Sequence, residues 1–160
     1  MIIAVDALGS DPITVSALLF TDGEEEPVFT YKDGRIATRQ ARFFREPEKV
    51  PKNLYGNLRQ YLLTRTLSRA LLRLRVCGHN KTIREGRRLE YMSLAVVRCL
   101  ERYYVDKPVE HDRDSIQVFV PGKDYLPARY LGNTTQIRYA DSNWQVGAAR
   151  LLALVSEDTL

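Results

Sequence analysis

Two acidic residues near opposite ends of the chain, Asp6 and Asp141, stand where metal ligands are often found. Asp6 closes the apolar run at residues 2–5 and precedes a turn at residues 9–12, and Asp141 precedes an apolar segment with a helical pattern. Two-metal phosphodiester hydrolysis needs several carboxylates around one small volume, and Mg²⁺ prefers hard oxygen ligands. If the elements that carry them are neighbours in a sheet, Asp6 and Asp141 could together hold Mg²⁺ or Mn²⁺.

Each of these acids also has a purely structural interpretation. Asp6 could serve as a turn residue, and Asp141 or Ser142 could cap the last helix. Asp124, which follows a predicted strand end, is a third candidate catalytic residue, with an ordinary loop acid as the alternative. The acidic run at residues 24–26 reads as a solvated hairpin tip. The acids therefore leave a metal site and a structural role open.

The middle of the chain is strongly basic. Residues 35–88 contain 15 Lys and Arg against three Glu, whereas residues 1–34 contain seven acids and one Lys. Arginine presents a planar fork of donors that matches phosphate, so this bias favours a nucleic-acid partner over an ordinary solvated face. The arginines predicted to contact nucleic acid are Arg35, Arg39, Arg42, Arg45, Arg65, Arg69 and Arg73.

The length of 160 residues predicts one domain covering residues 1–160. No apolar run is long enough to cross a bilayer, so no membrane partner is expected. The start of the chain lacks the pattern of a secretory signal. Cys77 and Cys99 lack a CxxC spacing, which favours free thiols in a reducing compartment. A cytoplasmic protein is therefore expected.

Apolar patterning predicts an α/β protein with the order β-β-β-α-α-β-β-α, in which helices pack on a mixed sheet. The first three strands should form an antiparallel meander, and the basic segment at about 35–56 should be irregular and flexible. The small residues Gly147, Ala148 and Ala149 should let the last helix pack closely on the sheet. The predicted strands cover residues 2–5, 13–20, 27–31, 115–120 and 134–139. The predicted helices cover residues 58–74, 82–104 and about 142–154.

Three segments resemble the type 2 ribonuclease H family in order and rough spacing. They are residues 6–12 after the first strand, residues 120–127 with their Pro-Gly and Leu-Pro pairs, and residues 140–149 with Ala-Asp-Ser followed by Ala-Ala. The resemblance implies an RNase H-like fold, a divalent metal held by Asp6 and Asp141, and a nucleic-acid substrate. The first segment is also similar to the opening of RuvC-type resolvases, which share that fold.

The chain departs from the family at the remaining catalytic positions. Ala7 stands where the family has Glu, and Pro121 where it has its third Asp. The Gly-Arg-Gly that reads a ribose 2′-hydroxyl falls on residues 9–11, which are Gly-Ser-Asp here. Two of the four family acids are therefore absent.

These departures leave three hypotheses for the function. The first is a divergent metal-dependent nuclease. The second is a catalytically degenerate protein that binds nucleic acid or a protein in a structural or regulatory role. The third is a structural subunit whose basic segment packs against acidic partners, and a homodimer or larger complex is left open.

Overall fold

A five-stranded mixed sheet forms the centre of the computed structural model, which describes residues 1–64, 68–76, 78–105, 116–122, 136–139 and 143–157. The strand order is β5-β2-β1-β6-β7. The two neighbours of β2 are antiparallel to it, whereas β6 is parallel to both β1 and β7. The strands are β1 (Ile2–Leu8), β2 (Ile13–Phe20), β5 (Arg69–Leu74), β6 (Gln117–Val120) and β7 (Gln136–Tyr139).

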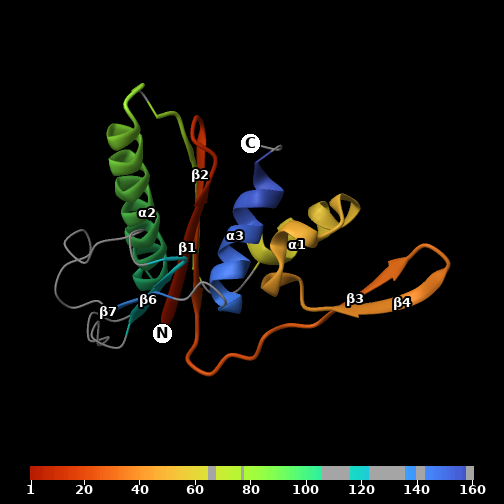
Figure 1. The fold of residues 1–160 in the computed structure, drawn as a ribbon. Helices are drawn as coiled ribbons and strands as arrows, with labels where there is room; N and C mark the ends of the chain where they lie inside the picture. Colours follow the sequence, from red (N-terminus) through yellow and green to blue (C-terminus); the bar gives the residue numbers. More distant parts are fainter. Residues whose placement is uncertain (65–67, 77, 106–115, 123–135, 140–142, 158–160) are drawn as a thin grey trace.

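Helices cover both faces of this sheet (Figure 1). The helix α2 (Lys81–Tyr104) lies on one face, and α3 (Trp144–Ser156) and α1 (Tyr55–Leu63) lie on the other. Side chains alternate along β1, so Ile3 and Val5 join the core under α2 while Ile2 and Ala4 join the core under α3. Because both faces are covered, all eight residues of β2 are buried.

The third strand is not part of a meander, so that prediction is wrong. Instead, β3 (Phe29–Asp33) pairs only with β4 (Ile36–Ala41) as a separate two-stranded hairpin that projects from the body (Figure 1). The side chains of β3 are half-buried or exposed and do not present a second buried face. The neighbour of β2 is β5, whose Ala70 packs into the α2 core while Leu71 packs on the other side.

The basic segment at residues 35–56 has more structure than the sequence predicts. It contains β4, three short 3₁₀ helices and the first two residues of α1. These 3₁₀ helices are η1 (Phe43–Arg45), η2 (Pro47–Lys49) and η3 (Lys52–Leu54).

The helix predicted over residues 58–74 ends early. Residues Tyr55–Leu63 form α1, but Arg69–Leu74 form the edge strand β5. The apolar residues of the run Arg-Ala-Leu-Leu-Arg-Leu fit a helical spacing, yet in the structure they alternate between the two cores. Burial on both sides of the sheet therefore decides the structure of this run, and its arginines do not form a helical stripe.

The two longer predicted helices are confirmed, and an asparagine caps each of them. Asn80 caps α2, and its Oδ1 accepts a hydrogen bond of 2.8 Å from the Thr82 amide. Asn143 caps α3, so the expectation that Asp141 or Ser142 does so is wrong. Both asparagines adopt the extended backbone typical of N-cap residues. Among the described helices, none is long and apolar enough to cross a membrane.

The start of α3 packs closely on the sheet, as predicted, through two of its three small residues. Ala148 and Ala149 are fully buried over the sheet, and the Ser16 hydroxyl on β2 donates a hydrogen bond to the Ala149 carbonyl. Gly147, however, lies against the backbone of Phe44 in η1 and not against the sheet. The 3₁₀ segment after the hairpin is thereby held on the helix.

Candidate functional site

Asp6 lies inside β1 and not in the turn that follows it. The strand continues to Leu8, and Asp6 pairs with Ser16 on β2. Its side chain points to the α3 face of the sheet and is 0% exposed. The carboxylate therefore sits in the middle of a protein layer, where an unpaired charge would be costly.

Two donors satisfy the Asp6 carboxylate. Its Oδ1 accepts a hydrogen bond of 2.7 Å from the Ala7 amide, and its Oδ2 lies 3.4 Å from Nη1 of Arg150 on α3. The same Arg150 guanidinium donates through Nε to Oε1 of Glu48 on η2. Arg150 thus bridges a buried carboxylate on β1 and an exposed carboxylate on η2.

The electrostatics of this cluster follow from burial and pairing. Burial raises the pKa of Asp6, although the Ala7 amide, Arg150 and Arg88 oppose that rise. Burial lowers the pKa of Arg150, but Asp6 and Glu48 outweigh it and the pKa is raised overall. Arg150 therefore supplies the countercharge that makes an ionised Asp6 tolerable at this depth.

The described residues do not fit a divalent-metal centre at Asp6. A metal ion there would meet the positive guanidinium of Arg150, and Glu48 contacts the same guanidinium instead of completing a ligand set. Within the described ranges, no group of three or more His, Cys, Asp or Glu is placed to hold a metal ion. The other two acids considered from the sequence, Asp124 and Asp141, lie outside the described residues.

The predicted nucleic-acid-binding arginines lie on different elements. Arg35 and Arg39 belong to the β3–β4 hairpin, where Arg39 forms an ion pair of 3.0 Å with Asp33. At the foot of the hairpin, Arg42 and Arg45 approach the same Glu26 oxygen at 3.9 and 2.7 Å. The side chain of Glu26 is only 8% exposed, so the prediction of a solvated acidic tip is wrong for this residue.

Two further predicted arginines lie on the edge strand of the sheet. Arg69 and Arg73 lie on β5, opposite Leu18 and Thr14 of β2, and so share one face of that strand. Burial, followed by the charge of Arg102, lowers the pKa of Arg69. Arg65 lies outside the described residues.

Sequence reasoning did not find Arg150, although the chain carries a signal for it. Arg150 is the only charged residue in the 13-residue helix α3, which otherwise consists of apolar and small or neutral polar residues. A lone charge in an apolar helix predicts a buried partner. The identity of that partner depends on how α3 crosses β1, and local patterning does not carry that information.

Comparison with known proteins supports the architecture. No protein-family model and no curated protein matches the sequence. Among solved structures, the crystal structure of the ribonuclease H2 from Pyrococcus horikoshii OT3 matches with a TM-score of 0.60. The match covers 98% of this chain and 72% of that chain, at 11% sequence identity. The fold is RNase H-like. The predicted fold class is thereby confirmed, and the type 2 assignment stays a prediction because likeness at this identity concerns the fold alone.

The raised pKa of Asp6 predicts a specific pH dependence of stability. The folded carboxyl binds its proton more readily than the unfolded one, whose pKa is near 3.8. The contribution of Asp6 to the free energy of unfolding is therefore greatest at acidic pH. It falls as pH rises from the pKa of Asp6 in the unfolded chain to its higher pKa in the folded protein. Asp6→Asn removes this loss, so its stability relative to the native protein should increase as pH rises above about 4.

Urea unfolding at successive pH values measures this difference. Asp33→Asn, at an exposed carboxyl on the hairpin, controls for the loss of a charge without the loss of a buried one. A stability difference between Asp6→Asn and the native protein that stays constant with pH would contradict the raised pKa.

Proposed function

We propose that this chain is an RNase H-like protein that binds nucleic acid and does not cleave it at Asp6. The contact between Asp6 and Arg150, at 3.4 Å, is the observation that carries the proposal. In a metal-dependent nuclease the first-strand carboxylate would face a cation held by further carboxylates. Here an arginine of the protein's own last helix is that cation, and Ala7 and Pro121 supply no additional carboxylate.

The basic hairpin supports nucleic acid as the partner. Arg39, Arg42 and Arg45 each keep about half of their side-chain surface exposed, at 48, 56 and 58%. The Arg39–Asp33 pair is exposed on both sides, so it contributes roughly 0–1 kcal/mol and can be exchanged for a phosphate contact. Arg42 and Arg45 are exposed at their own side chains but share the nearly buried Glu26 as a partner. Arg35 is exposed at the tip of the same hairpin.

Aromatic packing gives this hairpin a fixed base. Phe29 and Tyr31 on β3 contact the Phe43 ring on η1 with centroid separations of 5.7 and 5.2 Å. Phe29 also meets Phe44 and Tyr61 edge to face. Because the base is anchored in the α3-side core, the arginines are presented on an ordered element and less entropy is lost on binding.

A second candidate function is a divergent nuclease that uses Mg²⁺ or Mn²⁺ with Asp6 and Asp141 as ligands. The likeness to a ribonuclease H2 structure favours it. In that case, the Arg150 guanidinium would have to leave Asp6 when the metal binds.

Salt-dependent binding tests the proposal directly. Fluorescence anisotropy with labelled RNA–DNA hybrid, duplex DNA and single strands should give affinities that fall steeply with salt and should detect binding in EDTA, without Mg²⁺. The slope of log affinity against log salt is about −0.9 for each phosphate contact on duplex DNA, so Arg35→Ala with Arg39→Ala should reduce its magnitude by about two. Arg87→Ala is the matched control, because Arg87 pairs with Glu90 on the solvent side of α2.

Cleavage assays separate the two candidates. With Mg²⁺ or Mn²⁺, the native protein should leave every substrate as intact as Asp6→Asn does. Cleavage that is present in the native protein and lost in both Asp6→Asn and Asp141→Asn would replace the proposal with the nuclease. The absence of binding to any nucleic acid would contradict both and favour the structural-subunit hypothesis.

A further inference from the structure

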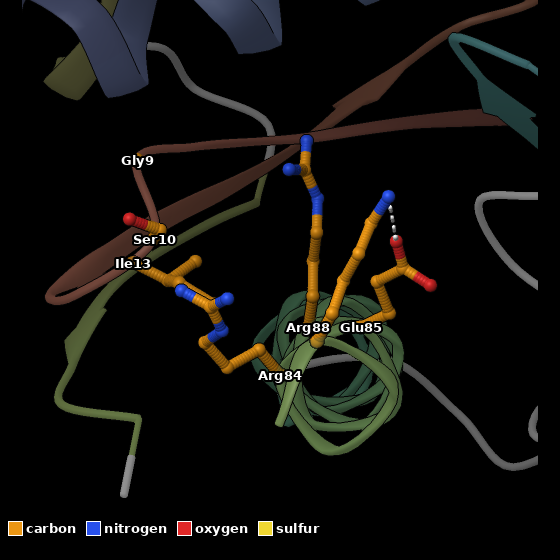
Figure 2. A pocket seen from close by; sticks show the side chains of 7 residues that line it. Gly9, Ser10, Ile13, Arg84, Glu85 and Arg88 are labelled. Carbon is orange, nitrogen blue, oxygen red and sulfur yellow. Dashed lines mark ion pairs between the residues drawn. The ribbon is translucent and has the colours of Figure 1, made fainter. Parts of the chain in front are cut away.

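A cavity of about 160 Å³ opens between the β1–β2 turn and the first turns of α2 (Figure 2). We call it the turn–helix pocket. The proposed nucleic-acid-binding arginines on the hairpin and on β5 do not line it. The residues that matter for its chemistry are Gly9, Ser10, Lys81, Arg84, Glu85 and Arg88.

The wall formed by α2 is strongly cationic. Lys81, Arg84 and Arg88 are spaced by three and four residues, so they share one face of the helix. Among the described residues, Glu85 is the only acid that lines the pocket, and its Oε1 lies 4.0 Å from Nζ of Lys81. Three cations against one carboxylate leave an excess of positive charge in a concave site, which favours an anionic ligand.

Arg84 carries an unsatisfied donor at this site. Its Nε is buried and has no hydrogen-bond partner in the described structure. Buried donors without a partner are uncommon because each costs the desolvation of a polar group. Figure 2 shows the Arg84 side chain extending from α2 toward the turn that carries Ser10 and Ile13. A ligand oxygen in the pocket would supply the missing acceptor once the Arg84 side chain turns, because Nε is closed to solvent in this conformation.

Arg88 is held in place by the strand. Its Nη2 donates a hydrogen bond of 2.7 Å to the Ala7 carbonyl, so the guanidinium is fixed over the end of β1. The first amides of α2 are partly occupied by Asn80, which accepts from the Thr82 amide through its side chain and from the Arg84 amide through its carbonyl. Side chains, and not the helix end, therefore provide the donors for a ligand.

We propose that the turn–helix pocket binds a phosphate group through Arg84, with Lys81 and Arg88 supplying charge and Ser10 a hydroxyl at the rim. Arginine forks match phosphate oxygens and make charge-assisted hydrogen bonds to them. The phosphate belongs to a bound nucleic-acid strand, a source that rests on the proposed function. The pocket would thus fix the register of a strand on a face of the protein that the arginine-rich hairpin does not form.

Inorganic phosphate tests the pocket without nucleic acid. In ¹⁵N-resolved NMR, phosphate should shift the Gly9 and Ser10 amides saturably. Arg84→Met, which keeps the aliphatic stem, should weaken this binding roughly tenfold, as expected for a lost charge-assisted contact. Arg84→Lys keeps the positive charge but not the planar guanidinium, so it should lose less phosphate affinity than Arg84→Met. Arg87→Met, at an exposed arginine of α2 that pairs with Glu90 and does not line the pocket, should leave the shifts unchanged.

Nucleic acid distinguishes the source of the phosphate. Arg84→Met should also weaken strand binding and reduce the magnitude of the salt slope by about one. If phosphate shifts the Gly9 and Ser10 amides but the protein binds no nucleic acid, the pocket is a site for free phosphate. That result would contradict the proposed function. A different result would overturn the inference and leave the proposed function intact. In that result, phosphate does not shift the Gly9 and Ser10 amides, and neither Arg84→Met nor Arg84→Lys changes the affinity for nucleic-acid strands.

Discussion

Replacing Gly147 with alanine is expected to prevent folding or to lower the free energy of unfolding by more than about 4 kcal/mol. A Cβ atom at this position would lie 1.6 Å from the Phe44 carbonyl oxygen and 2.8 Å from its carbonyl carbon. Both are backbone atoms of η1, so no side-chain rotation relieves the overlap. The helix and the 3₁₀ segment would have to separate, which would open the α3-side core.

Gly86→Ala is the matched control for this substitution. Gly86 also lies within a long helix, α2, but a Cβ there would meet no atom within 4 Å. Alanine at this position should stabilise the protein by roughly 0.5–1 kcal/mol, because it removes backbone entropy from the unfolded chain. Thermal unfolding followed by circular dichroism compares the two variants. Equal midpoints for Gly147→Ala and the native protein would contradict the close approach of α3 and η1.

Arg150→Met is expected to be the second most damaging of the changes considered, lowering the unfolding free energy by about 2–4 kcal/mol near neutral pH. The substitution keeps most of the side-chain volume but leaves the fully buried Asp6 carboxylate with one partner fewer. Breaking a fully buried ion pair usually costs about 3–5 kcal/mol. The loss expected here is somewhat smaller because the Arg150 side chain is itself 37% exposed. Urea unfolding gives the measurement.

A double-mutant cycle identifies the cause of that loss. Asp6→Asn placed in the Arg150→Met background should recover part of the stability, because it removes the charge that Arg150 neutralised. Glu48→Gln, which alters the exposed partner of the same guanidinium, should have a smaller effect. Additive effects of Asp6→Asn and Arg150→Met would show that the two side chains do not act as a pair.

The elements that could be predicted are those whose pattern has one interpretation. The strands β1 and β2 were predicted from their continuous apolar runs, although β1 extends to Leu8, and α2 was predicted from its helical spacing. The run Arg69–Leu74 fits either a helix or a strand, and its place beside β2 depends on burial from both sides. The Asp33-Gly34 pair after β3 is a local hairpin signal, but β4 was not predicted because residues 35–56 were expected to be irregular.

In the candidate site, too, local patterns could be predicted and contacts between distant segments could not. The position of Asp6 near the end of the first strand could be predicted, because a local pattern places it there. Its partner could not, since Arg150 reaches it from a helix whose register over β1 is set by packing. The turn–helix pocket was missed for the same reason: its cations read as part of a general basic bias until the β1–β2 turn is seen above them.

The central position of β1 has a consequence for how the protein is made. One edge of β1 pairs at once with its neighbour β2, but the other edge pairs with β6, more than a hundred residues later in the chain. The apolar hairpin of β1 and β2 therefore leaves the ribosome before β6 is synthesised, and one edge of β1 is unpaired during that time. Such an edge can pair with other nascent chains. Chains released before α3 is complete are therefore expected to aggregate or to be held by chaperones.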